Sequence, residues 1–411
     1  MTLLTIGMMG PSMASPDPSP TQGVSLRVTR VDVDSLTAGE VAEWSTLFAA
    51  QPSPSNPFLA MPWVRAWYHA YVPEEERRHL LWVRDERTGE LLGIAPMHLQ
   101  TTALGPVVLA SRLMPVGAGL TSTPLELPGV LAATTHIRDV SRALTSQQTV
   151  GHWRELPLAD SQGWFDPDWA GFGTGRKVAF VEQQRAYACV VLPLSSTWDA
   201  TRSGLKRNVK ESIRRSTNRL KKSGRPFRVD RLGEGIDAVA INRLLDLHRA
   251  RSATDRSSQR HHDAFADESS RQLLHAVLPE LGALGLASIF ELSLDSEVIA
   301  SQLVLHSPGT SYVHSSGFDA AHWSLGPITF LHSQLIQHAI DRGDTWVNFS
   351  PGPSVSKLRW SHALHVVNSF AYGSGPRSLS LRFALYQAAR AFRNRPIVST
   401  ATPAGDKTPG G

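Results

Sequence analysis

The sequence predicts an α/β protein built from two similar halves in tandem. Each half contains a predicted β-hairpin, in which two strand-like segments are joined by a short turn. The first hairpin lies at Leu80–Gln100 and the second at Leu286–His306. A helical segment precedes each hairpin, at Pro62–Tyr71 and at Ser269–Leu284. A unit of helix and hairpin that occurs twice indicates two copies of one α/β domain.

The composition excludes several classes of protein. The 411 residues suffice for two domains with sizeable cores, and 19% charged and 41% hydrophobic residues are ordinary for a globular chain. The single cysteine, Cys189, lies in the apolar run Tyr187–Leu192, where we expect a core strand. One cysteine excludes a disulfide framework and a cysteine-based zinc cluster, and we expect no metal site.

Neither end of the sequence reads as a targeting segment. No apolar run reaches the roughly 18–20 residues of a membrane-spanning helix. Residues 1–23 contain no Lys or Arg, which a secretory signal needs before its apolar core. We expect a disordered leader at 1–23, a helix at 376–395, a disordered tail at 396–411 and a cytoplasmic location.

Positive charge is concentrated in one segment, Arg202–Arg228. It contains eleven Lys or Arg against the single acid Glu211, so this segment carries +10 while the whole chain carries +5. The rest of the chain is therefore acidic, at about −5.

The same segment has the pattern of a helix between the two halves. Its apolar stripe predicts docking as a surface helix and consists of Leu205, Val209, Ile213, Ser216 and Leu220. Its cationic faces are compatible with plain solvation or with an anionic partner. That partner would be tRNA, a phosphate-rich lipid such as a lipid-linked sugar, or the membrane surface.

A strand–helix–strand unit in the second half is suited to a phosphate-bearing ligand. The polar strand Ser311–Phe318 leads to the helix Ile328–Asp341, which opens at Gly326-Pro327, and the strand Thr345–Phe349 follows. The start of a helix offers free backbone N–H groups to anions. The alternative is a helix start that binds nothing.

Several short motifs follow one another along the chain. They are Asn56-Pro57-Phe58-Leu59 with Trp63 and Trp67, Gly93-Ile94-Ala95-Pro96-Met97, Gly317-Phe318-Asp319, Ser324-Leu325-Gly326-Pro327, Asn348-Phe349-Ser350-Pro351-Gly352 and Lys357-Leu358-Arg359-Trp360. In this order they resemble the FemAB-type and cellulose-biosynthesis-protein-like branch of the GNAT acyltransferase superfamily. The resemblance covers roughly residues 40 to 375.

The resemblance implies two tandem GNAT-like domains, each a mixed, mostly antiparallel sheet flanked by helices. We expect the first domain at 24–195, a basic linking helix at 202–228 and the second domain at 229–375. The first half lacks a Gly-opened helix after a polar strand, so we expect it to keep the fold without a cofactor site.

The resemblance also implies an acyl-CoA site in the second domain. Backbone N–H groups at the helix start would hold the pyrophosphate, although Pro327 has none and the common Q/RxxGxG/A loop of the superfamily is missing. The expected cofactor-binding residues are Ser315, Ser316, Ser324, Leu325, Gly326, Ile328, Thr329 and Asn348.

Three residues are candidates for the chemistry. His314 lies on the strand that would line the acyl donor and is a candidate base, or a structural histidine. Asp319 is a candidate base or a turn former. Lys357 occupies the Lys of a YK..W-like ending and would hold a donor phosphate or the developing oxyanion, or else is an exposed loop lysine.

The function that the resemblance implies is acyl transfer from acyl-CoA, with acetyl-CoA as the first expectation. The acceptor would be an amine or hydroxyl on a small molecule or on a glycan or lipid-linked compound, and analogy points to polysaccharide or envelope metabolism. One alternative is a FemAB-like transferase that takes its donor from aminoacyl-tRNA. Another is a non-catalytic polyanion-binding protein on the same fold.

Overall fold

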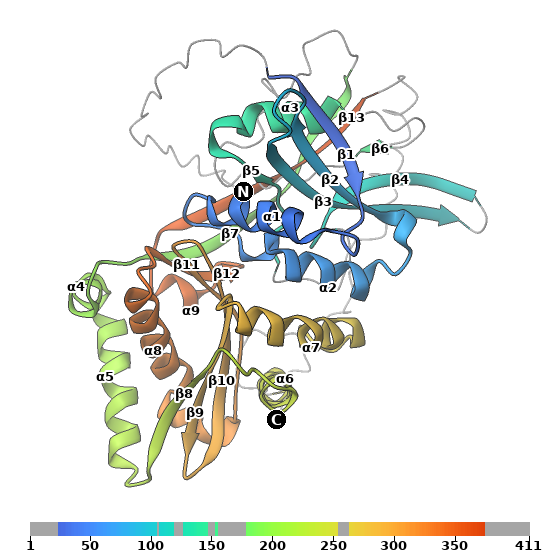
Figure 1. The fold of residues 1–411 in the computed structure, drawn as a ribbon. Coiled ribbons are helices and arrows are strands. Elements are labelled where there is room, and N and C mark those ends of the chain that lie inside the picture. The colour runs from blue at the N-terminus through green and yellow to red at the C-terminus, as the bar shows by residue number, and fades with distance from the viewer. Residues whose placement is uncertain are drawn as a thin grey trace, which may run out of the picture.

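Two sheets, each flanked by helices, make up the protein (Figure 1). The computed structural model describes residues 24–104, 107–118, 126–146, 153–154, 178–253 and 263–374. The expected leader, C-terminal helix and tail lie outside these residues. No helix in this part of the chain is both long and apolar enough to cross a membrane.

The first sheet has the strand order β1-β2-β3-β4-β6, with β5 paired to β3. Its strands are β1 (Leu26–Val31), β2 (Arg78–Asp85), β3 (Leu91–Leu104), β4 (Val107–Pro115), β5 (Leu131–Ala132) and β6 (Trp153–Arg154). The accompanying helices are α1 (Ala38–Ala49), α2 (Met61–Tyr71) and α3 (Ile137–Ser146). The antiparallel β2–β3 pair confirms the first predicted hairpin.

The second sheet has the order β13-β7-β12-β11-β10-β9-β8. Its strands are β7 (Val178–Pro193), β8 (Phe227–Leu232), β9 (Ala287–Leu294), β10 (Glu297–Ser307), β11 (Thr310–Phe318), β12 (Trp346–Pro351) and β13 (Leu364–Ser374). Its helices are α4 (Trp198–Gly204), α5 (Arg207–Lys222), α6 (Ala238–Ser252), α7 (Glu268–Ala283), α8 (Pro327–Asp341) and α9 (Val355–Leu358).

The second predicted hairpin is present, and its turn chemistry explains it. Leu294 pairs with Glu297 across a two-residue turn in which Asp295 and Ser296 both have positive φ, 51° and 69°. Positive φ at both central residues matches the right-handed twist of the flanking strands.

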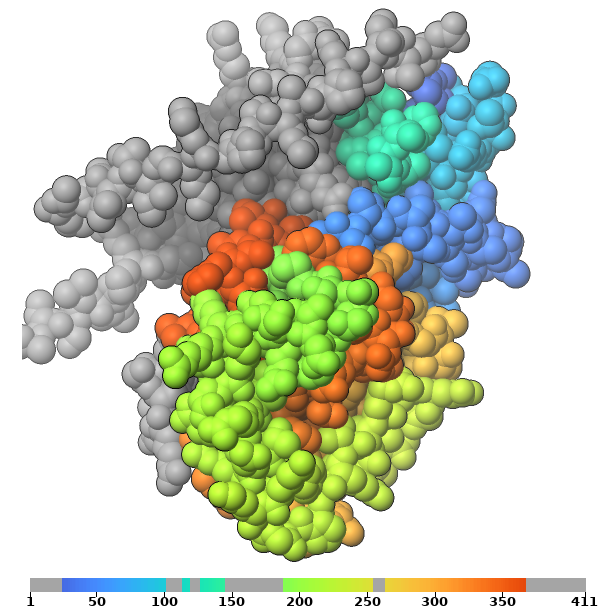
Figure 2. All heavy atoms as spheres, turned by 90° about the vertical axis from the view of Figure 1, so that its left-hand side faces the viewer, coloured from blue at the N-terminus to red at the C-terminus, as the bar shows by residue number. Residues whose placement is uncertain are grey.

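The two faces of the second sheet are covered by different helices. Alternate residues of one strand pack into different cores, as Ile289 lies with α6 and α7 whereas Phe290 lies with α5 and α8. Figure 2 looks onto the second face, where the green atoms of α4 and α5 lie against the orange atoms of the later chain. The core that contains Ile289 continues into the first half through Trp63 and Trp67 of α2.

One strand from before the expected domain boundary near residue 195 belongs to the second sheet. Strand β7 precedes that boundary, yet it pairs with β12 and β13 of the second sheet. Cys189 is fully buried in β7, as expected for a core strand residue. Sequential order does not decide which sheet a strand joins, and β7 joins the second sheet although it lies within the range 24–195.

The basic linking segment is also shorter and more divided than a helix over 202–228. It forms α4 and α5, with an extended residue, Leu205, between them, and Arg228 already belongs to β8. The predicted stripe is nonetheless buried: each of its five residues is at most 7% exposed. Helix α5 lies beside α8 along this stripe (Figure 1).

Helix α6 lies directly on strand β11, which positions two polar side chains described below. A Cβ added at Gly317 would lie 2.2 Å from the backbone nitrogen of His248, so only glycine allows this approach. The helix packs through Ala240, Ile241, Leu244 and Leu245, whereas Val239 is 58% exposed.

Candidate functional site

Strands β11 and β12 are parallel neighbours that separate partway along their length. They pair only from Thr310 to Tyr312, opposite Trp346 to Asn348. Beyond Tyr312, the edge of β11 that faces β12 has no strand partner in this register. A bulge in the β10–β11 pairing leaves out His314, since Leu303 pairs with Ser315 and Val304 with Val313. Bulges bend a strand and increase its twist, which suits a strand that turns away from its neighbour.

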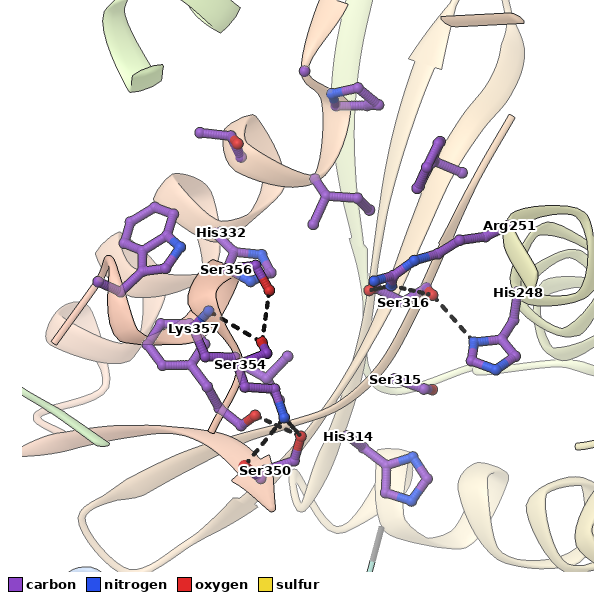
Figure 3. Close-up of a pocket in the computed structure, with 18 of the residues that line it drawn as sticks. His248, Arg251, His314, Ser315, Ser316, His332, Ser350, Ser354, Ser356 and Lys357 are labelled. Atoms are coloured by element: carbon purple, nitrogen blue, oxygen red, sulfur yellow. Dashed lines mark hydrogen bonds between the residues drawn. The ribbon is translucent and has the colours of Figure 1, made fainter. Parts of the chain in front are cut away.

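A pocket of about 1440 Å³ opens where the two strands separate (Figure 3). Its wall includes residues 313–316 of β11, the start of α8, the end of β12 and polar residues of α5 and α6. This volume exceeds the few hundred to 1,000 Å³ that is usual for small-molecule sites. The pocket therefore has room for a long ligand together with a second molecule.

The start of α8 forms one end of this pocket. Gly326, with φ 69° and ψ 47°, is the N-cap, and no side chain caps the helix. The backbone N–H groups of Ile328 and Thr329 have no partner among the described residues. Both residues line the pocket, so two unused donors and the positive end of the helix dipole lie at its wall.

Fewer of the residues predicted to bind phosphate at this helix start line the pocket than the sequence suggests. Ser324 and Leu325 belong to a 3-10 turn, Ala320–Leu325, and do not line the pocket. The carbonyl of Ser324 accepts a hydrogen bond from Arg219, and the N–H of Gly326 donates to Trp323 at 3.0 Å. The N–H of Gly326 is therefore already used, and of the residues at the helix start that line the pocket, Ile328 and Thr329 offer the unused N–H donors.

Lys357 of α9 lines the pocket, and its side chain reaches the end of β12 (Figure 3). Its Nζ donates to the carbonyl of Pro351 at 2.8 Å and to the Oγ and carbonyl of Ser350 at 3.1 and 3.2 Å. No ion pair joins it to a carboxylate in the described part of the chain. Burial lowers its pKa to about 8, because removing the ammonium from water disfavours the charged form.

Asn348 lies behind the pocket wall and holds Ser350, one of the residues that Lys357 contacts. It is fully buried and does not line the pocket. Its Oδ1 accepts a hydrogen bond of 2.9 Å from the N–H of Ser350. Ser350 has a positive φ of 64°, an uncommon conformation for a residue with a Cβ, and this bond helps to hold it. Asn348 thereby shapes the site of Lys357, and its contact with a cofactor stays a prediction.

His314 lines the pocket from an apolar environment. It is 5% exposed, stacks on Phe265 with ring centroids 6.1 Å apart, and lies near Trp63 and Phe58 of the first half. Burial lowers its pKa to about 3, so the ring is neutral at physiological pH. A base with so low a pKa removes a proton from an ammonium group poorly. The surroundings favour the structural alternative for His314.

Asp319 lies at the beginning of the 3-10 turn and outside the pocket wall. Its Oδ1 accepts from the N–H of Ala321 at 2.9 Å, and its Oδ2 contacts Nδ1 of His322 at 2.7 Å. These hydrogen bonds hold its pKa below the usual range, the backbone N–H of Ala321 most of all. The geometry is that of a turn former, the second of the two interpretations.

Helix α6 contributes two pocket residues that the sequence did not single out. Arg251 donates through Nη1 to the Oγ and carbonyl of Ser316 at 2.7 and 3.1 Å, and His248 contacts the same carbonyl through Nδ1 at 3.2 Å. Nε2 of His248 accepts from the N–H of Ala264 at 3.3 Å. His248 and Arg251 follow the buried Leu244 by four and seven residues, a helical spacing that places all three on one face.

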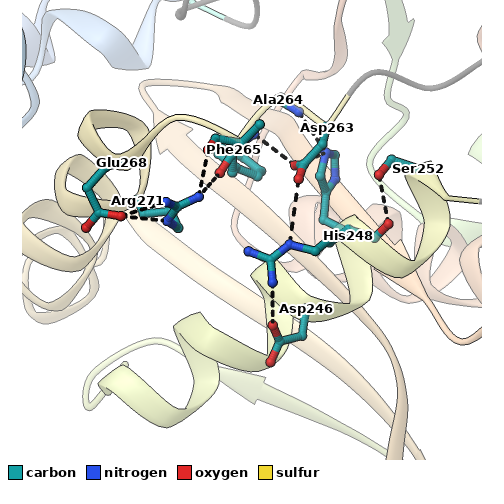
Figure 4. Close-up of polar contacts among 10 residues, drawn as sticks. Asp246, His248, Ser252, Asp263, Ala264, Phe265, Glu268 and Arg271 are labelled. Carbon is teal, nitrogen blue, oxygen red and sulfur yellow. Dashed lines mark hydrogen bonds and ion pairs between the residues drawn. The ribbon is translucent and has the colours of Figure 1, made fainter.

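The segment 263–267 contributes to the pocket wall, and polar contacts hold it in place (Figure 4). Asp263 accepts a hydrogen bond from the N–H of Phe265 at 3.0 Å and lies 3.8 Å from Nε of Arg249 on α6. Arg271 of α7 donates to the carbonyl of Phe265 at 2.8 Å. These contacts fix the stacked Phe265 ring against His314.

A third missed residue, His332, comes from α8. Its ring stacks on Phe349 at 5.4 Å and lies 5.4 Å from Trp360, while Nδ1 is 3.1 Å from the amide of Gln302. Burial lowers its pKa to about 3. His332 therefore contributes a neutral ring, held by its aromatic neighbours, to the pocket wall.

A serine, a histidine and an aspartate also meet outside the pocket, but not as a nucleophilic triad. Ser311 donates to Asp344 at 2.6 Å, and His306 contacts Ser311 at 3.1 Å and Ser288 at 3.1 Å. In a triad the histidine lies between the serine and the carboxylate. Here the serine lies in the middle, and none of these residues lines the pocket. Within the described residues, no cluster of His, Cys, Asp and Glu could hold a metal ion.

Comparison with known proteins agrees with this architecture. Residues 207–358 match the family model described as an acetyltransferase (GNAT) domain. The crystal structure of FemX has the same fold, with 10% sequence identity, a TM-score of 0.56, and coverage of 88% of this chain and 99% of FemX. A conserved protein of unknown function from Bacteroides thetaiotaomicron is 13% identical, with a TM-score of 0.51 and coverage of 85% and 100%. No curated protein matches the chain by sequence.

Both halves thus have a fold seen in FemX. The pocket is lined by residues of the matched segment 207–358 and by Arg359 and Trp360, which follow it directly. The segment 207–358 is therefore similar to the acetyltransferase (GNAT) domain family, and it supplies nearly all of the pocket wall.

Proposed function

We propose that the protein transfers an acyl group from acyl-CoA, acetyl-CoA in the simplest case, to an amine or hydroxyl acceptor. The acceptor would be a small molecule or a glycan or lipid-linked compound of polysaccharide or envelope metabolism in the cytoplasm. The separation of β11 from β12 beside the uncapped start of α8 carries this proposal. It supplies an unpaired strand edge for an amide-containing chain and two N–H donors for a phosphate.

The chemistry that suits this pocket is direct attack. The acceptor nucleophile bonds to the thioester carbonyl carbon, the carbonyl oxygen gains negative charge, and the carbon–sulfur bond then breaks to release the thiolate. Unpaired N–H groups on the edge of β11 are suited to hold the developing oxyanion, with Lys357 as a nearby cation. No covalent enzyme intermediate is required.

Few groups in the pocket are suited to accept a proton from the acceptor. His314 and His332 both have a pKa of about 3 and are weak bases at neutral pH. Lys357, with a pKa of about 8, lies closer to the working range. We assign Lys357 the role of a cation that stabilises negative charge, because its three hydrogen bonds to oxygen atoms are donated by an ammonium group.

Native mass spectrometry of the purified protein tests the donor class. We expect a co-purified or added acyl-CoA to shift the mass of the intact protein, and calorimetry to give a one-to-one binding isotherm with CoA. Absence of CoA binding, together with acyl transfer from aminoacyl-tRNA, would replace this proposal with the second candidate.

That second candidate is a FemAB-like transferase with an aminoacyl-tRNA donor, which the charge on α5 favours. The helix exposes cations on two sides: Arg215 and Arg219 line the pocket, whereas Arg207 and Lys222 do not. A small acyl-CoA would reach only the pocket side. A tRNA would neutralise cations on both sides, since its affinity depends on the number of phosphates contacted.

Two charge-reversal variants separate these donors. Arg215→Glu with Arg219→Glu should weaken CoA binding about 10-fold or more, since two carboxylates that repel phosphate replace two cations that attract it. Arg207→Glu with Lys222→Glu changes the charge equally and should leave CoA affinity unchanged while lowering tRNA affinity about 10-fold. Both variants should fold, because exposed charges add little to stability. Loss of acyl transfer in the second variant, with CoA binding intact, would point to a polyanionic donor or acceptor.

A further inference from the structure

An exposed tryptophan lies at the mouth of the pocket. Trp323 is 61% exposed, and of the large hydrophobic side chains that the structure describes as exposed, it is the one that lines the pocket. Such an exposed indole costs free energy in water, on the order of 25 cal/mol per Å² of apolar area. Neither acyl transfer nor the hydrophobic cores account for its position.

The ring is nevertheless held in place. One side packs on Phe318, with centroids 5.2 Å apart and planes at 37°. Asp319 caps the 3-10 turn that carries Trp323, and Arg219 binds the carbonyl of the next residue, Ser324. Asp319 is thus a positioning residue for Trp323. A fixed ring with one covered and one open side is suited to stacking on a flat ligand group.

Cations line the same pocket as this ring. Arg215 and Arg219 of α5 and Arg359 after α9 line the same pocket, and α5 contacts the turn that carries Trp323. Nε of Arg359 is buried without a hydrogen-bond partner among the described residues. The unused N–H groups of Ile328 and Thr329 lie on this wall as well. Guanidinium groups and helix starts bind phosphates well.

A stacking ring beside several phosphate-binding groups fits a nucleotide better than a sugar or a fatty chain, because only a nucleotide offers both a flat base and phosphates. We infer that Trp323 stacks on the nucleobase of the acyl donor while Arg215 and Arg219 bind its phosphates. This inference rests on the proposed function, because it assigns the nucleotide end of the CoA donor to the mouth of the pocket and the acyl end to the separated strands.

The test compares ligands that share one half of CoA. Calorimetry measures the affinity of the protein for three ligands. These are CoA itself, 4′-phosphopantetheine without the nucleotide, and adenosine 3′,5′-bisphosphate without the pantetheine. We expect Trp323→Ala to weaken CoA and the bisphosphate about 10-fold, the size of one lost base stack. Affinity for phosphopantetheine should stay unchanged. Trp323→Phe keeps a ring and should recover most of the loss.

Leu284→Ala is the matched control, because Leu284 is 58% exposed at the end of α7 and does not line the pocket. It should leave all three affinities unchanged. If wild-type protein binds CoA and Trp323→Ala binds it equally well, the inference is overturned and the proposed function stands. A raised KM for the acceptor alone would assign the ring to an acceptor sugar instead. If the wild type binds none of the three ligands, the proposed CoA donor and the inference both fail.

Discussion

Replacing Gly326 with glutamate is expected to abolish CoA binding, with a loss of at least about 100-fold in calorimetric affinity. A Cβ at this position would lie 3.2 Å from the Cβ of Ser216, and φ of 69° disfavours a side chain. The new carboxylate would lie at the start of α8, where it competes with phosphate for the N–H groups of Ile328 and Thr329. Charge repulsion adds to this competition.

Two controls separate charge from backbone strain. Gly326→Gln has the same size and strain as the glutamate and should keep part of the affinity. Gly343→Glu introduces a carboxylate at the opposite end of α8, where φ is 80° and a Cβ meets no atom within 4 Å. It should bind CoA normally. Equal affinity in Gly326→Glu and wild type, with an unchanged circular dichroism spectrum, would remove the start of α8 from the donor site.

Much of the fold could be predicted because local signals specify it. Turn residues between alternating strands marked both hairpins, and the Gly326-Pro327 pair marked the start of α8 within one residue. The buried stripe of α5 followed from helical spacing alone. Each of these features depends on residues close together in the sequence, so a pattern can reveal it.

Features that depend on distant strands were not visible in the sequence. The pairing of β7 with β12 and β13 joins residues more than 150 positions apart, and no local pattern records it. The positions of His248 and Arg251 follow from the approach of α6 to Gly317, which a strand pattern does not reveal. Asn348 and Asp319 have the residue types expected of a site, yet both bind backbone N–H groups, as short polar side chains often do.

Replacing Lys357 with methionine is expected to lower turnover by about 10- to 1000-fold, the range for losing one electrostatic stabiliser. Methionine fills similar space without charge. The unfolding temperature should change little, because removing a desolvated ammonium offsets the loss of its hydrogen bonds to Ser350 and Pro351. Lys206→Met is the matched control. Its Nζ is also half-buried and donates to a carbonyl, that of Leu358, but it does not line the pocket.

The pH dependence of turnover decides which form of Lys357 acts. Its pKa of about 8 means that the ammonium form predominates at pH 7 and is lost as the pH rises through 8. If the cation stabilises the oxyanion, this residue's contribution to turnover declines above pH 8. Lys357→Arg, whose guanidinium remains charged, should then keep partial activity without that decline. If neutral Lys357 instead accepts the proton of the acceptor, turnover rises through pH 8 and the arginine variant is as inactive as methionine. The first profile is the one that we expect, since every group in contact with Nζ is an oxygen acceptor.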